Sequence, residues 1–183
     1  MLFRSEDQKF FLTILRETSC VRADHVLPLL HLQFPDKTQY QADAMLRTLR
    51  YQGKVVPGED NIIRLAERRS APPCGNVLLG LDILLALQPR RLLQLSASRE
   101  PYPLCFLIQR KDEWIDHFAF LPVPPGRESY VSQLLQAEAV NYTFLLYLDA
   151  LDQHRRLILH RDHYFVVEQE GRLRFFKGGE ARR

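Results

Sequence analysis

Apolar residues recur at helical spacing in the first third of the chain. One run predicts a helix over residues 6–18, and Ser5 and Gln8 have the spacing of a capping box at its beginning. A second run predicts a short helix over residues 26–30, with Asp24 as its N-cap. Each run gathers its apolar positions on one side, so we expect both helices to pack one face against a core.

A third helical run has the clearest pattern of the three. Its apolar positions from Ala42 to Leu49 follow an i, i+3, i+4, i+7 spacing, which is typical of a helix with one buried face. Thr38 or Asp36 is placed to cap its beginning, and Gly53 is placed to end it. We therefore expect a helix whose opposite face is polar and exposed.

A β-hairpin is predicted directly after this third helix. The runs Lys54–Val56 and Ile62–Leu65 are rich in β-branched residues, and the sequence PGEDN between them is typical of a turn. Three helices followed by a hairpin is the order of a winged helix-turn-helix domain. We therefore expect residues 1–69 to form such a domain.

The rest of the chain has a different character. Residues 67–75 are charged and then rich in Pro and Gly, which is typical of a linker. Residues 77–87 predict a helix that is apolar on nearly all sides and hence buried, with Asn76 as its cap. The strand candidates that follow are Arg91–Leu95, Leu104–Gln109, Trp114–Val123 and Thr143–Leu148.

A helix over residues 128–139 separates the last two of these strands. Residues 156–159 are a further short strand candidate, and Tyr164–Val167 with Arg172–Phe176 predict a closing hairpin. Strands interspersed with helices indicate a small α/β domain with a central sheet over residues 76–178. The whole chain is therefore expected to be α+β.

Composition and charge exclude only a few classes of protein. The 183 residues carry a net charge of +3, with 11 Lys and Arg against 9 Asp and Glu in residues 1–69 and 14 against 13 in the remainder. Cys20, Cys74 and Cys105 are scattered, without the spacing of a zinc module or a disulfide scaffold. No segment approaches the roughly 20 apolar residues of a membrane span. These features predict a cytoplasmic protein without a membrane partner.

The polar face of the third helix carries residue types that read DNA. In a helix-turn-helix, the second helix of the motif enters the major groove. Gln and Arg can each make two hydrogen bonds to adenine and guanine, and Lys and Tyr can hold phosphates. The hairpin adds basic side chains for the flanking backbone. The candidate DNA-binding residues are Lys37, Thr38, Gln39, Tyr40, Asp43, Arg47, Arg50, Lys54 and Arg64.

A protein-interaction or dimerisation module on the same fold is the alternative. Asp43 lies in the middle of the polar face and would repel phosphate, and Glu59 and Asp60 make the hairpin tip acidic. The small excess of positive charge gives DNA binding little further support. Double-stranded DNA is the preferred partner, and a homodimer or a protein partner bound through the C-terminal domain is the other possibility.

A divergent metal-dependent nuclease is the third possibility, because acids beside a lysine can hold Mg²⁺ and orient water. The segment Lys111-Asp112-Glu113, however, falls between two strand candidates, where a polar turn is expected. Asp116 follows on the next strand and shares its face with aromatic side chains by alternation. The chain has no GxSxG, GxGxxG or P-loop motif. We expect no enzymatic activity, no catalytic residue, no metal site and no cofactor.

The segment VRADHVLPLLHLQFPDKTQYQADAMLRTLRYQGKVV resembles the replication-relaxation family of plasmids and conjugative mobile elements, including its uncharacterised Gram-positive branch. The layout of the C-terminal half is similar to a reduced restriction-endonuclease-like fold. Family members often show an Arg-Pro-Asp before one strand and an acidic pair on the next, whereas Leu121 and Val123 stand here where carboxylates would be expected. The resemblance implies a catalytically degenerate fold and a non-enzymatic DNA-binding protein in replication control, maintenance or transcription of a plasmid or mobile element.

Overall fold

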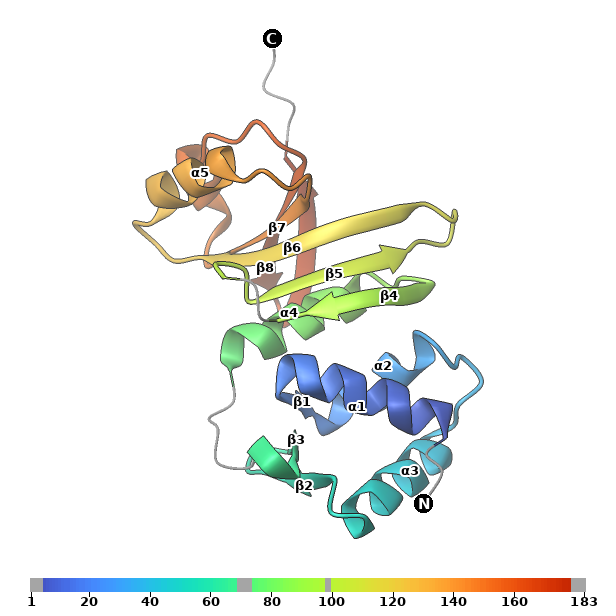
Figure 1. Ribbon diagram of the computed structural model, residues 1–183. Helices are drawn as coiled ribbons and strands as arrows, with labels where there is room; N and C mark the ends of the chain where they lie inside the picture. The colour runs from blue at the N-terminus through green and yellow to red at the C-terminus, as the bar shows by residue number, and fades with distance from the viewer. Residues whose placement is uncertain (1–4, 69–73, 98–99, 179–183) are drawn as a thin grey trace.

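The computed structural model describes residues 5–68, 74–97 and 100–178 and has a mixed α+β fold with two sheets. An N-terminal unit contains a three-stranded sheet, and a C-terminal unit, which begins at residue 74, contains a six-stranded sheet. The two units are stacked, with helix α4 (Gly75–Ala86) between the larger sheet and the N-terminal helices (Figure 1). The predicted α+β class is confirmed at this level.

Short amphipathic segments build the N-terminal unit. Its helices are α1 (Glu6–Thr18), the 3₁₀ helix η1 (Ala23–His25), α2 (Val26–His31), α3 (Gln39–Tyr51) and the 3₁₀ helix η2 (Ala66–Arg68). Its strands are β1 (Cys20–Arg22), β2 (Val55–Pro57) and β3 (Ile62–Leu65), which pair antiparallel in the order β1-β3-β2. The helices predicted from periodicity and the hairpin that follows them are confirmed.

Strand β1 is not predicted by the sequence pattern. Its three residues are too few to show an alternation of apolar and polar positions. The strand forms because the predicted hairpin leaves one edge of β3 open, and Val21 pairs there with Ile63. Both side chains are buried. A long-range partner therefore determines this element.

Ser5 occupies the N-cap position of α1 as predicted, but the capping box predicted there and the cap predicted at Asp24 are wrong. The Ser5 side chain makes no capping hydrogen bond, and the carboxylate of Asp7 instead accepts the backbone N–H of Gln8 at 2.9 Å. Asp24 lies inside η1, where its carboxylate accepts a hydrogen bond from Arg22 at 3.2 Å. The carboxylate near each cap has a cationic partner, which is Lys37 for Asp7 and Arg22 for Asp24.

The C-terminal unit is a sheet with one α-helix on each face. Its helices are α4, α5 (Glu128–Ala137) and the 3₁₀ helix η3 (Leu151–Arg156). Its strands are β4 (Arg91–Ser96), β5 (Leu104–Gln109), β6 (Ile115–Val123), β7 (Thr143–Leu148), β8 (His163–Gln169) and β9 (Arg172–Lys177), hydrogen-bonded in that order. β4, β5 and β6 are antiparallel, β7 and β8 continue parallel to β6, and β9 returns antiparallel. The four strands predicted between Arg91 and Leu148 and the closing hairpin are confirmed, apart from small differences at their ends.

Alternation along β6 separates the two cores of this unit. Phe118 and Phe120 face α4, whereas Ala119 and Leu121 face α5. Gly80 lies where α4 crosses the sheet, and a Cβ at this position would stand 2.9 Å from a ring carbon of Phe120. Glycine therefore allows a helix-to-sheet approach that a larger residue would prevent.

The cap of α4 and one short strand are predicted wrongly. Asn76 lies inside α4, and Cys74 occupies the N-cap position. Residues 156–159 form no strand, because the chain leaves η3 and runs along α5, where the hydroxyl of Ser132 accepts the N–H of Ile158 at 3.1 Å. The predicted linker over residues 67–75 falls in part on residues 69–73, which lie outside the described residues.

One hydrophobic cluster runs through both units. Leu15 and Leu29 of the N-terminal unit and Leu81 and Leu84 of α4 are fully buried within it. Helix α4 therefore buries one side against the sheet and another against the N-terminal unit, which explains why its sequence is apolar nearly all round. Among the described residues, no helix has the length and apolar character needed to span a bilayer.

Candidate nucleic-acid interface

Helix α3 lies at the end of the molecule remote from the large sheet (Figure 1). Thr38 caps it as predicted: its hydroxyl accepts the N–H of Gln41 at 3.3 Å, and the Gln41 side chain accepts the N–H of Thr38 at 3.0 Å. The apolar stripe from Ala42 to Leu49 is buried. The polar face of α3 therefore points into solvent.

Two tyrosines and an arginine share this exposed face. Tyr40 is 75% exposed and Tyr51 is 95% exposed. The guanidinium carbon of Arg47 lies 6.0 Å from the centroid of the Tyr40 ring, at the outer limit of a cation–π contact. Tyr51 is not among the DNA-binding residues predicted from the sequence. Its position 11 residues after Tyr40, about three helical turns later, could have placed it on the same face.

Gln39 and Asp43 form a pair one turn apart on α3. The Gln39 amide nitrogen donates to a carboxylate oxygen of Asp43 at 2.8 Å, and both side chains are exposed. This bond orients the Gln39 amide and leaves its oxygen and one N–H available to a ligand. Asp43 is thus a partner of Gln39 as well as a negative charge on the face.

Lys37 is held by α1 at the entrance to α3. Its ammonium nitrogen lies 2.6 Å from a carboxylate oxygen of Asp7. Burial raises the pKa of Asp7, but the hydrogen bonds from Lys37, Ser5 and the N–H of Gln8 outweigh it and hold the pKa below its ordinary value. Lys37 therefore connects α1 to the start of α3, and its charge is largely neutralised there.

The hairpin contributes one exposed and one partly buried basic residue. Lys54 is exposed just after α3, and its backbone N–H donates to the carbonyl of Leu49 at 2.9 Å. Arg64 lies on the central strand β3, and its guanidinium Nε would be 3.1 Å from a Cβ placed at Gly58. The Arg64 head group therefore packs over the hairpin backbone, whereas Lys54 extends the basic surface of α3.

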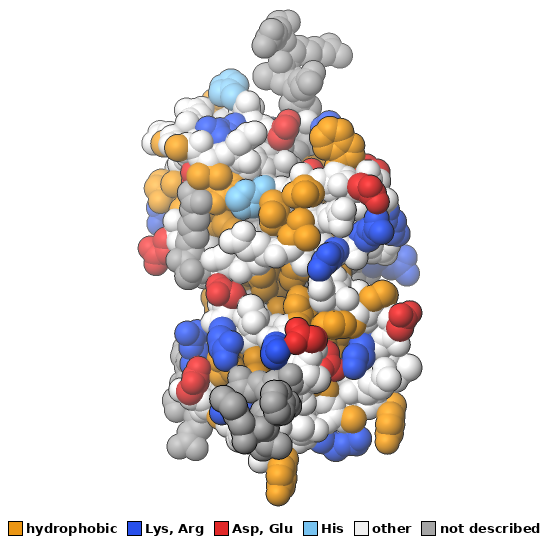
Figure 2. All heavy atoms as spheres, turned by 45° about the vertical axis from the view of Figure 1, so that its right-hand side comes forward, with side chains coloured by type: hydrophobic (Ala, Val, Ile, Leu, Met, Phe, Trp, Pro, Cys, Tyr) orange, Lys and Arg blue, Asp and Glu red, His pale blue; other side chains and the backbone are white. Residues whose placement is uncertain are grey.

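The charge on this end of the molecule is positive but mixed. Arg47, Arg50 and Lys54 are exposed on or beside α3, with Asp43 among them. Figure 2 shows basic side chains interspersed with acidic and hydrophobic ones on the lower part of its face, and hydrophobic side chains projecting from the lower edge, at the height of α3 in Figure 1. The surface has the combination of cations and aromatic groups expected of a nucleic-acid or protein contact.

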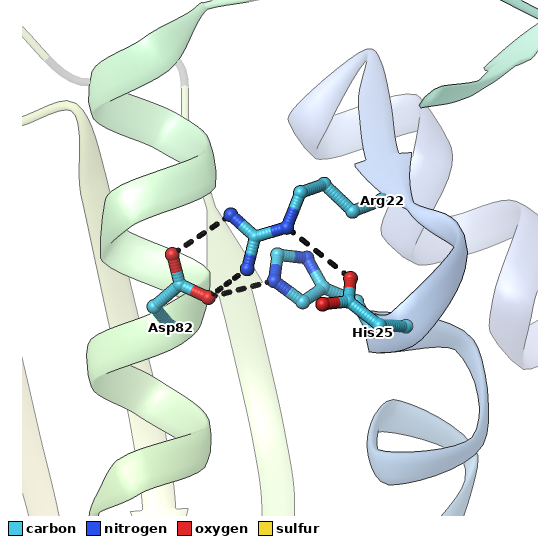
Figure 3. A network of polar contacts seen from close by, with 4 residues as sticks. Arg22, His25 and Asp82 are labelled. Carbon is cyan, nitrogen blue, oxygen red and sulfur yellow. Dashed lines mark hydrogen bonds and ion pairs between the residues drawn. The ribbon is translucent and has the colours of Figure 1, made fainter. Parts of the chain in front are cut away.

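A second polar cluster lies where the two units meet (Figure 3). Both carboxylate oxygens of Asp82 on α4 accept hydrogen bonds from the Arg22 guanidinium, one of them at 3.0 Å. Nε2 of His25 lies 2.9 Å from the same carboxylate, and its side chain is only 3% exposed. The cluster links β1 and η1 to the one charged residue in the sequence of α4. Its partners are 57 and 60 residues from Asp82 in sequence, so no local pattern predicts the cluster.

The pKa of Asp82 is the result of opposing effects. Burial raises it, but the hydrogen bonds and the charges of His25 and Arg22 lower it by more, so the net pKa is below the ordinary value. The carboxylate is therefore stable in its charged form at the boundary between the units. This arrangement connects the N-terminal unit to α4, which packs on the large sheet.

The acids considered for a nuclease site form ion pairs at the β5–β6 turn. Arg110 contacts Asp112 at 3.3 Å and Asp116 at 3.1 Å, and Arg90 contacts Glu113 at 2.8 Å. Within the described ranges, no group of three His, Cys, Asp or Glu side chains is arranged to hold a metal ion. This turn has the character of a solvated hairpin.

A cavity of about 230 Å³ lies between α5 and the segment before β8. Leu135, Phe144 and Ile158 give it apolar walls. Arg161 also lines it, but its guanidinium donates to the backbone carbonyls of Glu138 and Val140, the latter at 2.9 Å. The arginine therefore braces the loop after α5.

Comparison with models of known protein families and with curated protein sequences finds no match to this chain.

Proposed function

We propose that the N-terminal unit is a winged helix-turn-helix domain that binds double-stranded DNA through α3. The element order α1-β1-α2-α3-β2-β3 and the strand order β1-β3-β2 support this proposal. A winged helix has the same order, with a short strand after its first helix that pairs with the hairpin. In such a domain α2 and α3 are the helix-turn-helix, and α3 enters the major groove.

The observation that carries the proposal is the exposed polar face of α3 at one end of the molecule, opposite a buried stripe. Gln39, already oriented by Asp43, has the groups needed for an adenine edge, and Arg47 has those needed for a guanine edge. Arg50 and Lys54 supply phosphate contacts beside them. Thr38 and Lys37 set the position of the helix.

The C-terminal unit is proposed to be a reduced restriction-endonuclease-like fold without catalytic function. Its order α4-β4-β5-β6-α5-β7, with an antiparallel β4-β5-β6 meander and β7 parallel to β6, supports this assignment. Leu121 and Val123 are buried at the positions where carboxylates would be expected. We propose that this unit braces the DNA-binding unit through Asp82. The resemblance to proteins of mobile elements suggests a role in replication control, maintenance or transcription.

The proposal is tested by fluorescence anisotropy with a pool of labelled duplexes of mixed sequence, at salt concentrations from about 50 to 200 mM. We expect binding at low salt and an affinity that falls steeply as salt rises. Lys54→Ala should reduce the slope of log K against log salt by about one. Arg155→Ala, which removes an exposed arginine of η3, is the matched control and should leave the slope unchanged.

A protein-interaction module is the second candidate function, because two tyrosines on α3 are almost fully exposed. Tyrosine is enriched in the cores of protein interfaces. If this function holds, the chain should fail to bind duplexes at the lowest salt. Its sedimentation behaviour should then change with concentration or with a partner, and Tyr51→Ala should abolish that change.

A further inference from the structure

The spacing of Tyr40 and Tyr51 fits the width of a DNA groove. The residues are 11 positions apart on a 13-residue helix, which corresponds to a separation of about 16 Å along the axis and a rotation of only about 20°. The major groove of B-DNA is about 12 Å wide. Because this separation exceeds the groove width by a few Å, a helix that enters the groove at an incline would place one tyrosine near each phosphate rim.

Basic side chains lie close to both tyrosines on the exposed face of α3. Arg47 lies between the tyrosines on the same face of α3, with its guanidinium carbon 6.0 Å from the centroid of the Tyr40 ring. Arg50 and Lys54 are close to Tyr51 in sequence and are exposed, so the C-terminal end of α3 presents cations toward a phosphate rim. This charge is complementary to DNA. A tyrosine hydroxyl is a neutral donor that commonly bonds phosphate oxygens.

We propose that Tyr40 and Tyr51 are phosphate-contact residues that bracket the major groove of duplex DNA, with Arg47 between them facing the base edges. The inference rests on the proposed function and adds how α3 is placed in the groove. The two hydroxyls fix how far and in which direction α3 enters the groove. Tyr40 also positions Arg47 through the contact between its ring and the guanidinium.

The experiment compares Tyr51→Phe and Tyr40→Phe with wild type by anisotropy, using the full chain and duplexes of mixed sequence. Each variant removes only a hydroxyl group. Each should weaken binding about three- to tenfold on all duplexes, because a single neutral hydrogen bond is lost. The salt slope should stay unchanged, because a neutral donor releases no counterion, whereas Arg50→Ala should reduce it by about one.

The C-terminal unit offers a matched control. Tyr130 on α5 is 57% exposed and has Arg127 at 6.0 Å from its ring centroid, which reproduces the surroundings of Tyr40. Tyr130→Phe should bind DNA like wild type. Thermal unfolding of every variant should match wild type, since each changed hydroxyl is on an exposed side chain.

The outcomes separate this inference from the proposed function. If wild type binds duplexes but both Tyr→Phe variants bind equally well, the inference is overturned and the function stands. If Tyr51→Phe is silent and Tyr51→Ala is strongly impaired, the ring packs against a surface and the hydroxyl–phosphate contact is wrong. If wild type does not bind at the lowest salt, both fall together.

Discussion

Nε2 of His25 lies 2.9 Å from a carboxylate oxygen of Asp82, and the two residues belong to different units of the molecule. His25 is buried in η1, and Asp82 is the one charged residue in the sequence of the otherwise apolar helix α4. Arg22 approaches the same carboxylate from the end of β1. A single acid thus connects the segment that precedes α2 to the helix that packs on the large sheet (Figure 3).

Replacing Asp82 by alanine should destabilise the whole chain. The change leaves a buried imidazole and a partly buried guanidinium without their carboxylate, which costs about 2–3 kcal/mol in the free energy of unfolding. Urea denaturation measures this directly. Asp152→Ala, which removes an exposed acid of η3, should change the value by less than about 0.5 kcal/mol. Equal stabilities of the two variants would show that the cluster contributes nothing.

The same carboxylate should make stability depend on acid pH. Its pKa in the folded chain lies below the ordinary value of 3.8, because hydrogen bonds from His25 and Arg22 outweigh the effect of burial. A lowered folded pKa stabilises the folded state fully above the unfolded pKa, and this stabilisation is lost as pH falls through the folded pKa. The advantage of wild type over Asp82→Asn should therefore shrink as pH falls below about 4. An advantage that keeps growing as pH falls from about 4 to 2 would contradict the assignment.

Lys37 should act on stability more than on DNA affinity. Its ammonium group contacts Asp7 at 2.6 Å in a site where the Asp7 side chain is only 10% exposed. Lys37→Ala should lower the free energy of unfolding by about 1–2 kcal/mol. Lys9→Ala breaks a similar pair with Glu6 that is largely exposed, and should cost less than about 0.5 kcal/mol. Thermal unfolding of both variants compares their stabilities. If Lys37→Ala instead reduces the slope of log K for DNA binding against log salt by about one, Lys37 is a phosphate contact.

Much of the fold could be predicted from the sequence, because its main signals are local. The stripe from Ala42 to Leu49 and the capping pattern at Thr38 are contained in α3 itself, and alternation along β6 assigned both of its faces. Strand β1 could not be predicted, because three residues carry no period and the pairing of Val21 depends on Ile63, 42 positions later (63 − 21).

The site was predicted less completely than the fold. The helical period of α3 predicted which of its faces is polar, and Gln39 and Arg47 on that face are exposed as expected. The period does not show that Arg64 packs over Gly58, or that Asp82 meets residues about 60 positions away. Those contacts depend on tertiary packing, so no short sequence motif predicts them.

Arg47 should determine sequence preference. A guanidinium on the exposed face of a recognition helix can make two hydrogen bonds to guanine, and its loss costs about 1–3 kcal/mol on the preferred site. Arg47→Ala should therefore weaken binding to a selected duplex about 5- to 150-fold and relax the preference at one base pair. Selection of bound sequences from a random pool, repeated with Arg155→Ala as control, measures both effects. An unchanged preference in Arg47→Ala would remove the residue from base recognition.

The contact of α3 with DNA is tested most directly by nuclear magnetic resonance. Backbone amide signals of the ¹⁵N-labelled chain are followed as a duplex of mixed sequence is added at low salt. The account predicts that the largest shifts fall on residues 38–54, with α5 and the β8–β9 hairpin unaffected. Shifts centred on the C-terminal unit, or no shifts at a DNA excess, would contradict DNA binding through α3.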